Sequence, residues 1–205
     1  MAIDKLIFQI RECEILVPIA NGSKKMEVVI IIDILRRAKA NVVVASVEDK
    51  LEIMASRQVK LVADMLIDEA AKLSYDLIVL PGGLGGAQAF AKSEKLVNML
   101  KKQKESNRPY GARCASPALV LKPHGLLKFA DTNSKSAAAS LVTLPKDDNK
   151  LSDQSEIENR VVVDGNLITS RESGTSMEFA LAIVEKFFGR NKALELAKIL
   201  LFTRT

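Results

Sequence analysis

The 205-residue chain has a formal net charge of +5, a hydrophobic fraction of 48% and an aromatic fraction of only 4%. Its 30 basic residues are interspersed with 25 acidic ones, and aromatic platforms for stacking bases are few, so we expect no specific nucleic-acid partner. No stretch approaches the ~18 consecutive apolar residues of a membrane span, and the first residues do not resemble a secretory signal. Two distant cysteines do not resemble a disulfide framework or a zinc site. We therefore expect a cytoplasmic protein, with the nucleus as a second compartment.

The first half of the chain alternates apolar strand patterns with helical ones. The expected elements, in order, are a strand at 14–20, a helix at 24–38, a strand at 41–47, extended pieces at 51–54 and 59–62, a strand at 76–80, and a helix from the glycine-rich turn 81–87 to about residue 104. Strands that are apolar almost throughout are typical of parallel sheets covered on both faces.

The second half continues this alternation around a polar interruption. We expect a strand at 110–113, a helix at 116–121, a loop at 129–154, a hairpin turning at Asp164-Gly165, a capping box at 175–178 that opens a helix to residue 188, and a last helix at about 191–202. The pattern predicts an α/β fold with a mainly parallel sheet. We expect one domain over residues 14–205, preceded by an N-terminal extension at 1–13.

Cys114 is the most informative candidate for chemistry, because it lies at a sharp turn between an expected strand and an expected helix. Such a turn holds a side chain out of the sheet, and the helix after it favours thiolate over thiol. Buried cysteines are usually inert packing, so from the turn alone the two interpretations are equally weighted.

Two further turns should meet Cys114 at the carboxyl edge of the sheet, where open α/β folds bind ligands. One offers the carboxylate of Glu27, which has the alternative explanation of a favourable charge in the first turn of a helix. The other offers backbone N–H groups at 81–87, whose glycines fail the dinucleotide fingerprint. A nucleophile, a carboxyl partner and an oxyanion site together suit covalent carbonyl chemistry without cofactor or metal.

His124, the only histidine, argues against a Cys-His hydrolase. Ten positions along a mostly helical path place it on the order of 12–15 Å from Cys114, beyond hydrogen-bond reach. A second subunit bringing its own His124 to the site stays open. Arg113 precedes the thiol at the end of an expected buried strand, so it either points into the site or strains the fold.

Several segments carry a family resemblance: 16–20 with Met26-Glu27, 33–38, 76–83, Cys114-Ala115-Ser116-Pro117, and 168–171 with 174–180. With them, roughly residues 14–200 resemble the ThiJ/PfpI superfamily in its DJ-one branch, the parkinsonism-associated deglycases. The chain looks closest to plant members, which often carry two such domains in tandem.

The resemblance implies a flavodoxin-like three-layer sandwich of the class I glutamine amidotransferase type, usually a homodimer. Cys114 matches the reactive cysteine, Glu27 the protonated glutamate that hydrogen-bonds it, and Gly82 and Gly83 the oxyanion glycines; we add the amide of Ala115. Small reactive carbonyls are the implied substrates, in a glyoxalase or deglycase reaction. Departures from the family pattern occur at Lys24, Lys25, Arg113, Glu172-Ser173, Ser134 and the segment 129–149.

These residues support three hypotheses. In the leading one, the Cys114 thiolate adds to methylglyoxal, amides near Gly83 and Ala115 hold the oxyanion, and Glu27 moves the proton between carbons. In the second, the protein is a redox sensor or chaperone that acts through oxidation of Cys114. The third, an inert family member, is motivated by Arg113 and Glu172.

Overall fold

The computed structural model describes residues 13–127 and 160–203. The expected loop at 129–154 and nearly all of the expected N-terminal extension at 1–13 lie outside these residues. The single domain over residues 14–205 stays a prediction.

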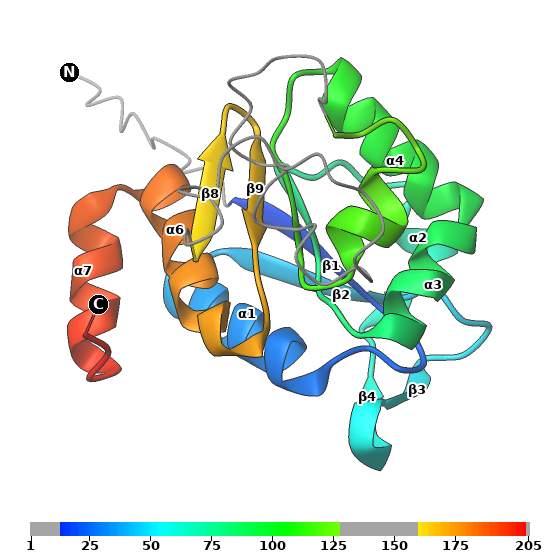
Figure 1. Ribbon diagram of the computed structural model, residues 1–205, viewed down its shortest axis with the longest axis horizontal. Coiled ribbons are helices and arrows are strands. Elements are labelled where there is room, and N and C mark those ends of the chain that lie inside the picture. Colours follow the sequence, from blue (N-terminus) through cyan, green and yellow to red (C-terminus); the bar gives the residue numbers. More distant parts are fainter. Residues whose placement is uncertain (1–12, 128–159, 204–205) are drawn as a thin grey trace, which may run out of the picture.

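A seven-stranded sheet forms the centre of the molecule, in the order β5-β2-β1-β6-β7-β9-β8 (Figure 1). All neighbouring pairs are parallel except β8 and β9, which form the hairpin expected around Asp164-Gly165. The strands are β1 (Glu14–Ile19), β2 (Asn41–Ser46), β5 (Met65–Leu66), β6 (Leu77–Leu80), β7 (Tyr110–Arg113), β8 (Val161–Asp164) and β9 (Leu167–Ser170).

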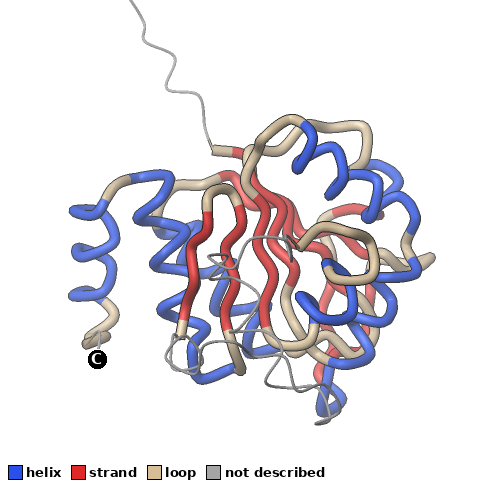
Figure 2. Tube along the Cα trace, turned by 45° about the horizontal axis from the view of Figure 1, so that its top comes forward, coloured by secondary structure: helices blue, strands red, loops and turns tan. Residues whose placement is uncertain are grey.

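Helices cover both faces of this sheet, as Figure 2 shows with helices and strands in separate colours. One face carries α1 (Lys25–Arg37), α6 (Ser176–Phe188) and α7 (Arg190–Ile199), which pack with strand residues into one apolar cluster. The other face carries α2 (Ile67–Ala70), α3 (Leu84–Lys92) and α4 (Glu94–Glu105), which pack into a second cluster. The expected three-layer α/β sandwich with a mainly parallel sheet is confirmed.

Helix α1 shows how periodicity overrides local propensity. Its β-branched run would suit a strand, yet Val28, Ile31 and Ile34 are buried at helical spacing while Val29 on the opposite face is 51% exposed. The helix therefore forms because its apolar stripe fits the sheet.

Sequence expectations are wrong for the helices before residue 104 and at residue 175. The single helix from the turn 81–87 to residue 104 is broken, because Ser93 is extended and its Oγ accepts a hydrogen bond from Leu96 N–H, which starts α4 anew. The capping box at 175–178 does not form either. Thr175 Oγ1 donates to the Glu172 carbonyl, and Glu178 pairs with Arg160 instead of the helix end.

A two-stranded hairpin, β3 (Glu52–Ala55) and β4 (Val59–Val62), projects beyond the main sheet (Figure 1). Backbone hydrogen bonds tie it to the loop after β1, from Gly22 N–H to Met54 O (2.8 Å) and from Ser56 N–H to Ser23 O (2.8 Å). The insert is thereby fixed beside the loop that leads into α1. Among the described residues, none of the helices has the length and apolarity needed to cross a membrane.

Candidate active site

Three turns meet at the carboxyl edge of the sheet, directly after β1, β6 and β7. Because these strands are parallel neighbours, the residues just after them lie side by side. They line a cavity of about 590 Å³ that reaches Cys114 and Ala115 from β7, Gly83 from β6, and Lys24 from the loop after β1. The expected meeting of these three segments is confirmed.

Cys114 forms a sharp elbow at the end of β7. Its φ of +53° is left-handed, a conformation that costs a non-glycine residue on the order of 1–3 kcal/mol. The N–H of Cys114 is shared between Ser170 O (3.1 Å) and Arg171 O (3.2 Å), so the end of β9 holds the elbow in place. The chain then forms one wide π-helical turn, Pro117–Leu121, rather than the expected α-helix.

Gly82 allows the thiol and Glu27 to approach each other. A Cβ at this position would lie 2.3 Å from Cys114 Cβ and 2.6 Å from Glu27 Oε2, which no side chain tolerates. Gly83 adopts φ +99°, a backbone conformation that favours glycine. Both glycines are thus required by the shape of the site.

Glu27 is fully buried in the first turn of α1. Its Oε2 accepts a hydrogen bond from Gly82 N–H (2.8 Å), and its Oε1 accepts one from Ser173 Oγ (3.0 Å). The resemblance implied a hydrogen bond between Glu27 and the thiol, but the thiol is bonded to Glu172 instead. With the Gly82 amide engaged by Glu27, the Gly83 amide is the one that hydrogen-bonds the sulfur.

Arg113 points into the site and is fully buried beneath it. Its Nε lies 3.5 Å from Glu27 Oε2, and one guanidinium nitrogen donates to the Glu172 carbonyl at 2.6 Å. A second nitrogen donates to Ser176 Oγ, and the guanidinium lies over the Phe179 ring, 5.6 Å from its centroid. A buried cation is tolerated here because a buried carboxylate and several oxygens compensate it.

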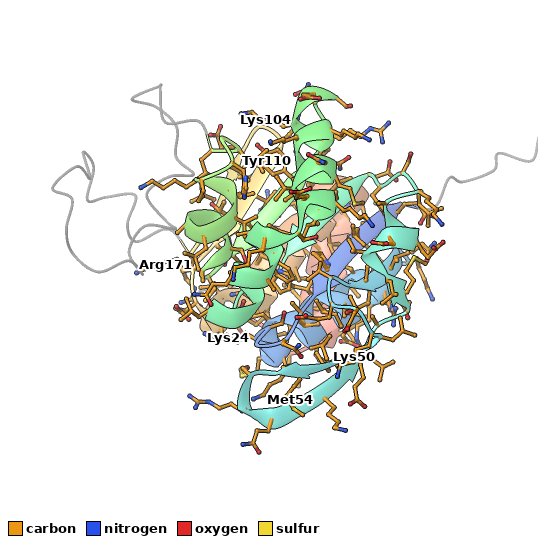
Figure 3. All side chains as sticks on the ribbon, turned by 90° about the vertical axis from the view of Figure 1, so that its right-hand side faces the viewer. Lys24, Lys50, Met54, Lys104, Tyr110 and Arg171 are labelled. Atoms are coloured by element: carbon orange, nitrogen blue, oxygen red, sulfur yellow. The ribbon has the colours of Figure 1, made fainter. Side chains whose placement is uncertain are left out.

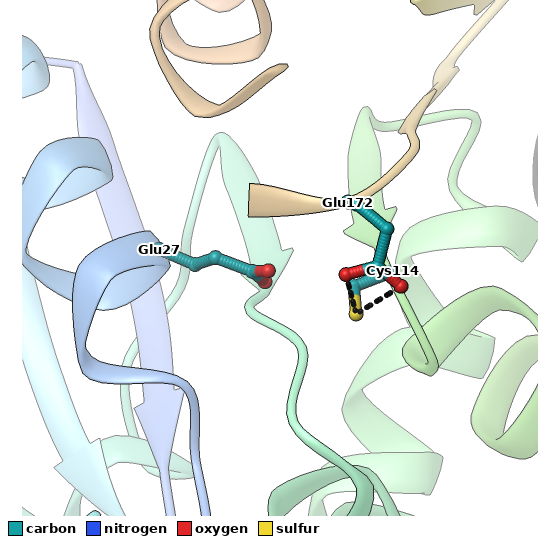
Figure 4. Close-up of side chains that lie close together, drawn as sticks. All are labelled: Glu27, Cys114 and Glu172. Carbon is teal, nitrogen blue, oxygen red and sulfur yellow. Dashed lines mark hydrogen bonds between the residues drawn. The ribbon is translucent and has the colours of Figure 1, made fainter. Parts of the chain in front are cut away.

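Glu172 and Lys24 belong to the site, although in the sequence they stand out only as departures from the family pattern. Both carboxylate oxygens of Glu172 lie 3.5 Å from Cys114 Sγ, and the side chain reaches the sulfur from the loop after β9 (Figure 4). Lys24 Nζ lies 2.8 Å from Glu172 Oε2 and 3.8 Å from Cys114 Sγ. A carboxylate and an ammonium thus cover the sulfur from the cavity side.

The pKa of the Cys114 thiol is raised from its ordinary value. Burial is the largest cause and the charge of Glu27 adds to it, whereas the Gly83 N–H and the Lys24 ammonium oppose it. The expected helix after the elbow is one short π turn, and burial is the largest influence on the pKa of the thiol. Lys24 in turn lowers the pKa of the Glu172 carboxyl through their hydrogen bond.

Glu27, Cys114 and Glu172 present three donor atoms within 4.8 Å of one another, a set that metals can use. Lys24 Nζ lies 2.8 Å from Glu172, 3.8 Å from Glu27 and 3.8 Å from the thiol. A tethered ammonium therefore already provides the positive charge that these donors need.

His124 lies outside the site of its own chain. Its Nε2 is 3.1 Å from the Ala91 carbonyl on α3, so it takes part in joining the segment after the π turn to that helix.

A family model, described as the DJ-1/PfpI family, matches residues 13–186. The chain belongs to the DJ-1/PfpI family. Two Arabidopsis thaliana relatives, "Protein DJ-1 homolog B" and "Protein DJ-1 homolog A", are 69% and 61% identical over 90% of this chain. The chain spans only 40% and 45% of the length of these two relatives.

Solved structures and a named enzyme extend the comparison. The structure of "Toxoplasma gondii DJ-1, oxidized" superposes with a TM-score of 0.81 at 38% identity, over 94% of this chain and 100% of that one. A Caenorhabditis elegans relative named "Glutathione-independent glyoxalase DJR-1.2" is 28% identical over 86% of this chain and 89% of its own. The family and fold implied by the sequence resemblance are thereby confirmed.

The charges around Cys114 generate a prediction about its titration. In a Cys13→Ser background, we expect the pH profile of alkylation by iodoacetamide to have its midpoint above that of a free thiol. Lys24→Met should move the midpoint further up, because it removes a cation that favours thiolate, and Glu172→Gln should move it down. At neutral pH the alkylation rate should therefore fall severalfold in Lys24→Met and rise severalfold in Glu172→Gln.

Lys104→Met, on α4, is the matched control for loss of a lysine charge and should leave the profile unchanged. A wild-type midpoint below that of a free thiol, or opposite shifts in the two variants, would contradict this account of the site.

Proposed function

We propose that this DJ-1/PfpI protein is a cysteine-dependent, cofactor-independent glyoxalase that converts methylglyoxal and glyoxal to hydroxy acids. One observation carries the proposal: the Cys114 sulfur borders a cavity of about 590 Å³ with the Gly83 amide bonded to it and the Glu27 carboxylate within 4.8 Å. A nucleophile, an oxyanion donor and an acid-base group lie within reach of one small substrate.

The first step is addition of the thiol to the aldehyde. The S–H bond breaks, an S–C bond forms, and the proton ends on the former aldehyde oxygen, giving a hemithioacetal. While negative charge develops on that oxygen, the amides of Gly83 and Ala115 stabilise it in a partly dehydrated cavity.

The second step moves a proton between the two substrate carbons. Glu27 removes the proton from the carbon bound to sulfur and returns it to the neighbouring carbon, while the hydroxyl proton on the sulfur-bound carbon passes to the ketone oxygen. The ketone thereby becomes an alcohol and the sulfur-bound carbon a thioester. The hydrogen bonds from Gly82 and Ser173 hold the carboxylate in one orientation for both transfers. Water then hydrolyses the thioester, which releases lactate and restores the thiol.

In a deglycase reaction, the Cys114 sulfur would displace the amine from its hemiaminal with methylglyoxal: an S–C bond forms, the C–N bond breaks, and the amine leaves with the thiol proton, which gives the same hemithioacetal. This activity is a secondary proposal, because it rests on the same residues as the glyoxalase and no separate observation favours it.

A second candidate function is redox sensing, alone or coupled to chaperone activity. Two molecules of peroxide, each reduced to water, would take Cys114 through sulfenic to sulfinic acid. The ammonium of Lys24, 3.8 Å from the sulfur, favours this candidate because it would pair with the sulfinate. Neither cysteine forms a disulfide, which fits the cytoplasm as the proposed compartment.

We also propose a homodimer. Apolar side chains on α1 and on the β3–β4 hairpin are exposed: Met26 by 54%, Val29 by 51% and Met54 by 43%. Exposed apolar side chains grouped on neighbouring elements mark interaction surfaces.

The glyoxalase proposal predicts that lactate formation from methylglyoxal depends on two residues. Cys114→Ser and Glu27→Gln should each lower kcat/KM by at least about 10²-fold, since each removes a group that takes part in the reaction. Cys13→Ser is the matched cysteine control and should retain the wild-type rate. Equal rates for wild type, Cys114→Ser and Glu27→Gln would refute the proposal.

The redox proposal predicts selective oxidation. After mild peroxide treatment, mass spectrometry should find two added oxygens on the peptide that contains Cys114, and Lys24→Met should reduce the yield. Preferential oxidation of Cys13, or no oxidation, would remove this candidate.

The dimer proposal predicts a particle of twice the 22.4 kDa chain mass in sedimentation experiments. Val29→Glu should dissociate it, whereas Leu194→Glu, at an equally exposed position on α7, should not. A monomeric wild type would end this proposal.

A further inference from the structure

The cavity above Cys114 carries more positive than negative charge. Its charged lining residues are Lys24, Lys25, Arg57 and Glu172, three cations and one acid. Its volume of about 590 Å³ lies within the range of pockets that hold drug-sized ligands. A three-carbon dicarbonyl such as methylglyoxal would leave much of this space and all of this charge unused.

Glu172, the one acid in the lining, shows where a carboxylate binds in this cavity. The Glu172 side chain is 53% exposed, and its carboxylate lies between Lys24 Nζ (2.8 Å) and Cys114 Sγ (3.5 Å). It therefore occupies the space directly above the nucleophile, where a substrate has to enter. Because the pair is half exposed, water screens it, and another carboxylate can exchange with it at little cost.

Two further cations stand beside this pair. Lys25 donates one hydrogen bond, to the Ser56 carbonyl (3.2 Å), and an ammonium has three donors. Arg57 lies at the tip of the β3–β4 hairpin with a left-handed φ of 59°. The hydrogen bond from Ser56 N–H to Ser23 O fixes this tip beside the loop that carries Lys24, and Figure 3 shows Lys24 close to the hairpin that bears Met54.

We propose that the cavity selects carbonyl compounds that carry a carboxylate, and that this carboxylate replaces Glu172 at Lys24 and pairs with Lys25. The reaction at the carbonyl rests on the proposed glyoxalase function, but the carboxylate subsite does not. In the unliganded protein, Glu172 is the internal carboxylate that fills the subsite and covers the thiol.

Alkylation of Cys114 tests the subsite without any enzymatic turnover. Iodoacetate and iodoacetamide differ mainly in that iodoacetate carries a carboxylate. Both alkylate the thiolate, so the rate with iodoacetate divided by the rate with iodoacetamide does not depend on the thiolate fraction. In a Cys13→Ser background, we expect this ratio to be several times that of N-acetylcysteine. Lys25→Met should lower it and Glu172→Gln should raise it.

Lys104→Met removes the same charge at a site far from Lys24 in Figure 3 and should leave the ratio unchanged. A wild-type ratio equal to that of N-acetylcysteine, or a ratio insensitive to Lys25→Met, would overturn the subsite.

A matched pair of dicarbonyls tests selection during turnover. 4,5-Dioxopentanoate and 2-oxopentanal have the same carbon chain and end in a carboxylate and a methyl group, respectively. We expect kcat/KM to be at least about tenfold higher for the carboxylate, which corresponds to about 1.4 kcal/mol of discrimination, and Lys25→Met to reduce the preference.

The two experiments separate the two proposals. Turnover of both compounds at equal kcat/KM would overturn carboxylate selection while the glyoxalase function stands. Turnover of neither compound, together with a high alkylation ratio, would end the glyoxalase function while supporting the carboxylate subsite.

Discussion

The site depends on a position that has room only for hydrogen. At Gly82 the backbone passes so close to Cys114 and Glu27 that any Cβ would overlap both. This proximity lets the Gly82 amide hold the Glu27 carboxylate while the next amide, of Gly83, faces the sulfur. The thiol and the carboxylate come from elements far apart in sequence, and the end of β6 brings them together.

Charge around the sulfur is arranged as two opposed pairs at different depths. The buried pair, Arg113 and Glu27, lies beneath the thiol, and the half-exposed pair, Glu172 and Lys24, lies on the cavity side. The buried pair is enclosed and fixed by hydrogen bonds, so removing one partner would leave an uncompensated charge in the interior. The outer pair is screened by water and can rearrange. The site therefore combines a fixed buried ion pair beneath the thiol with an outer ion pair that can exchange partners.

Most of the fold could be predicted from the sequence, because it rests on local patterns. A short run of apolar residues identifies a strand such as β1, the Asp-Gly pair identifies the hairpin, and the helical spacing of apolar residues identifies α1. None of these patterns needs tertiary information. The helix break at Ser93 and the failed cap at Thr175 could not be predicted so easily. Ser93 caps the next helix locally in the middle of a continuous helical pattern, and Thr175 bonds Ser170 and Glu172 rather than the helix end, so both outcomes depend on how the surrounding residues pack.

The site was predictable in its positions and less so in its charges. The elbow at Cys114, Glu27 and the glycines after β6 can be placed from strand order alone. That Glu172 rather than Glu27 hydrogen-bonds the thiol cannot, since its side chain reaches the sulfur from the loop after β9. The unusual residues at Lys24 and Glu172 were the available signal, because two departures of opposite charge are candidates for an ion pair.

The strand order also determines when the site is complete during synthesis. β1, β6 and β7 lie next to one another in the sheet, so the thiol, Glu27 and the two glycines can assemble once Cys114 has left the ribosome. Glu172 and Ser173 come after β9, which pairs with β7 and emerges more than fifty residues later. A nascent chain therefore exposes Cys114 before it contains either Glu172 or the carbonyls at the end of β9 that hold the elbow, so folding of the last strands both fixes the cysteine and covers it.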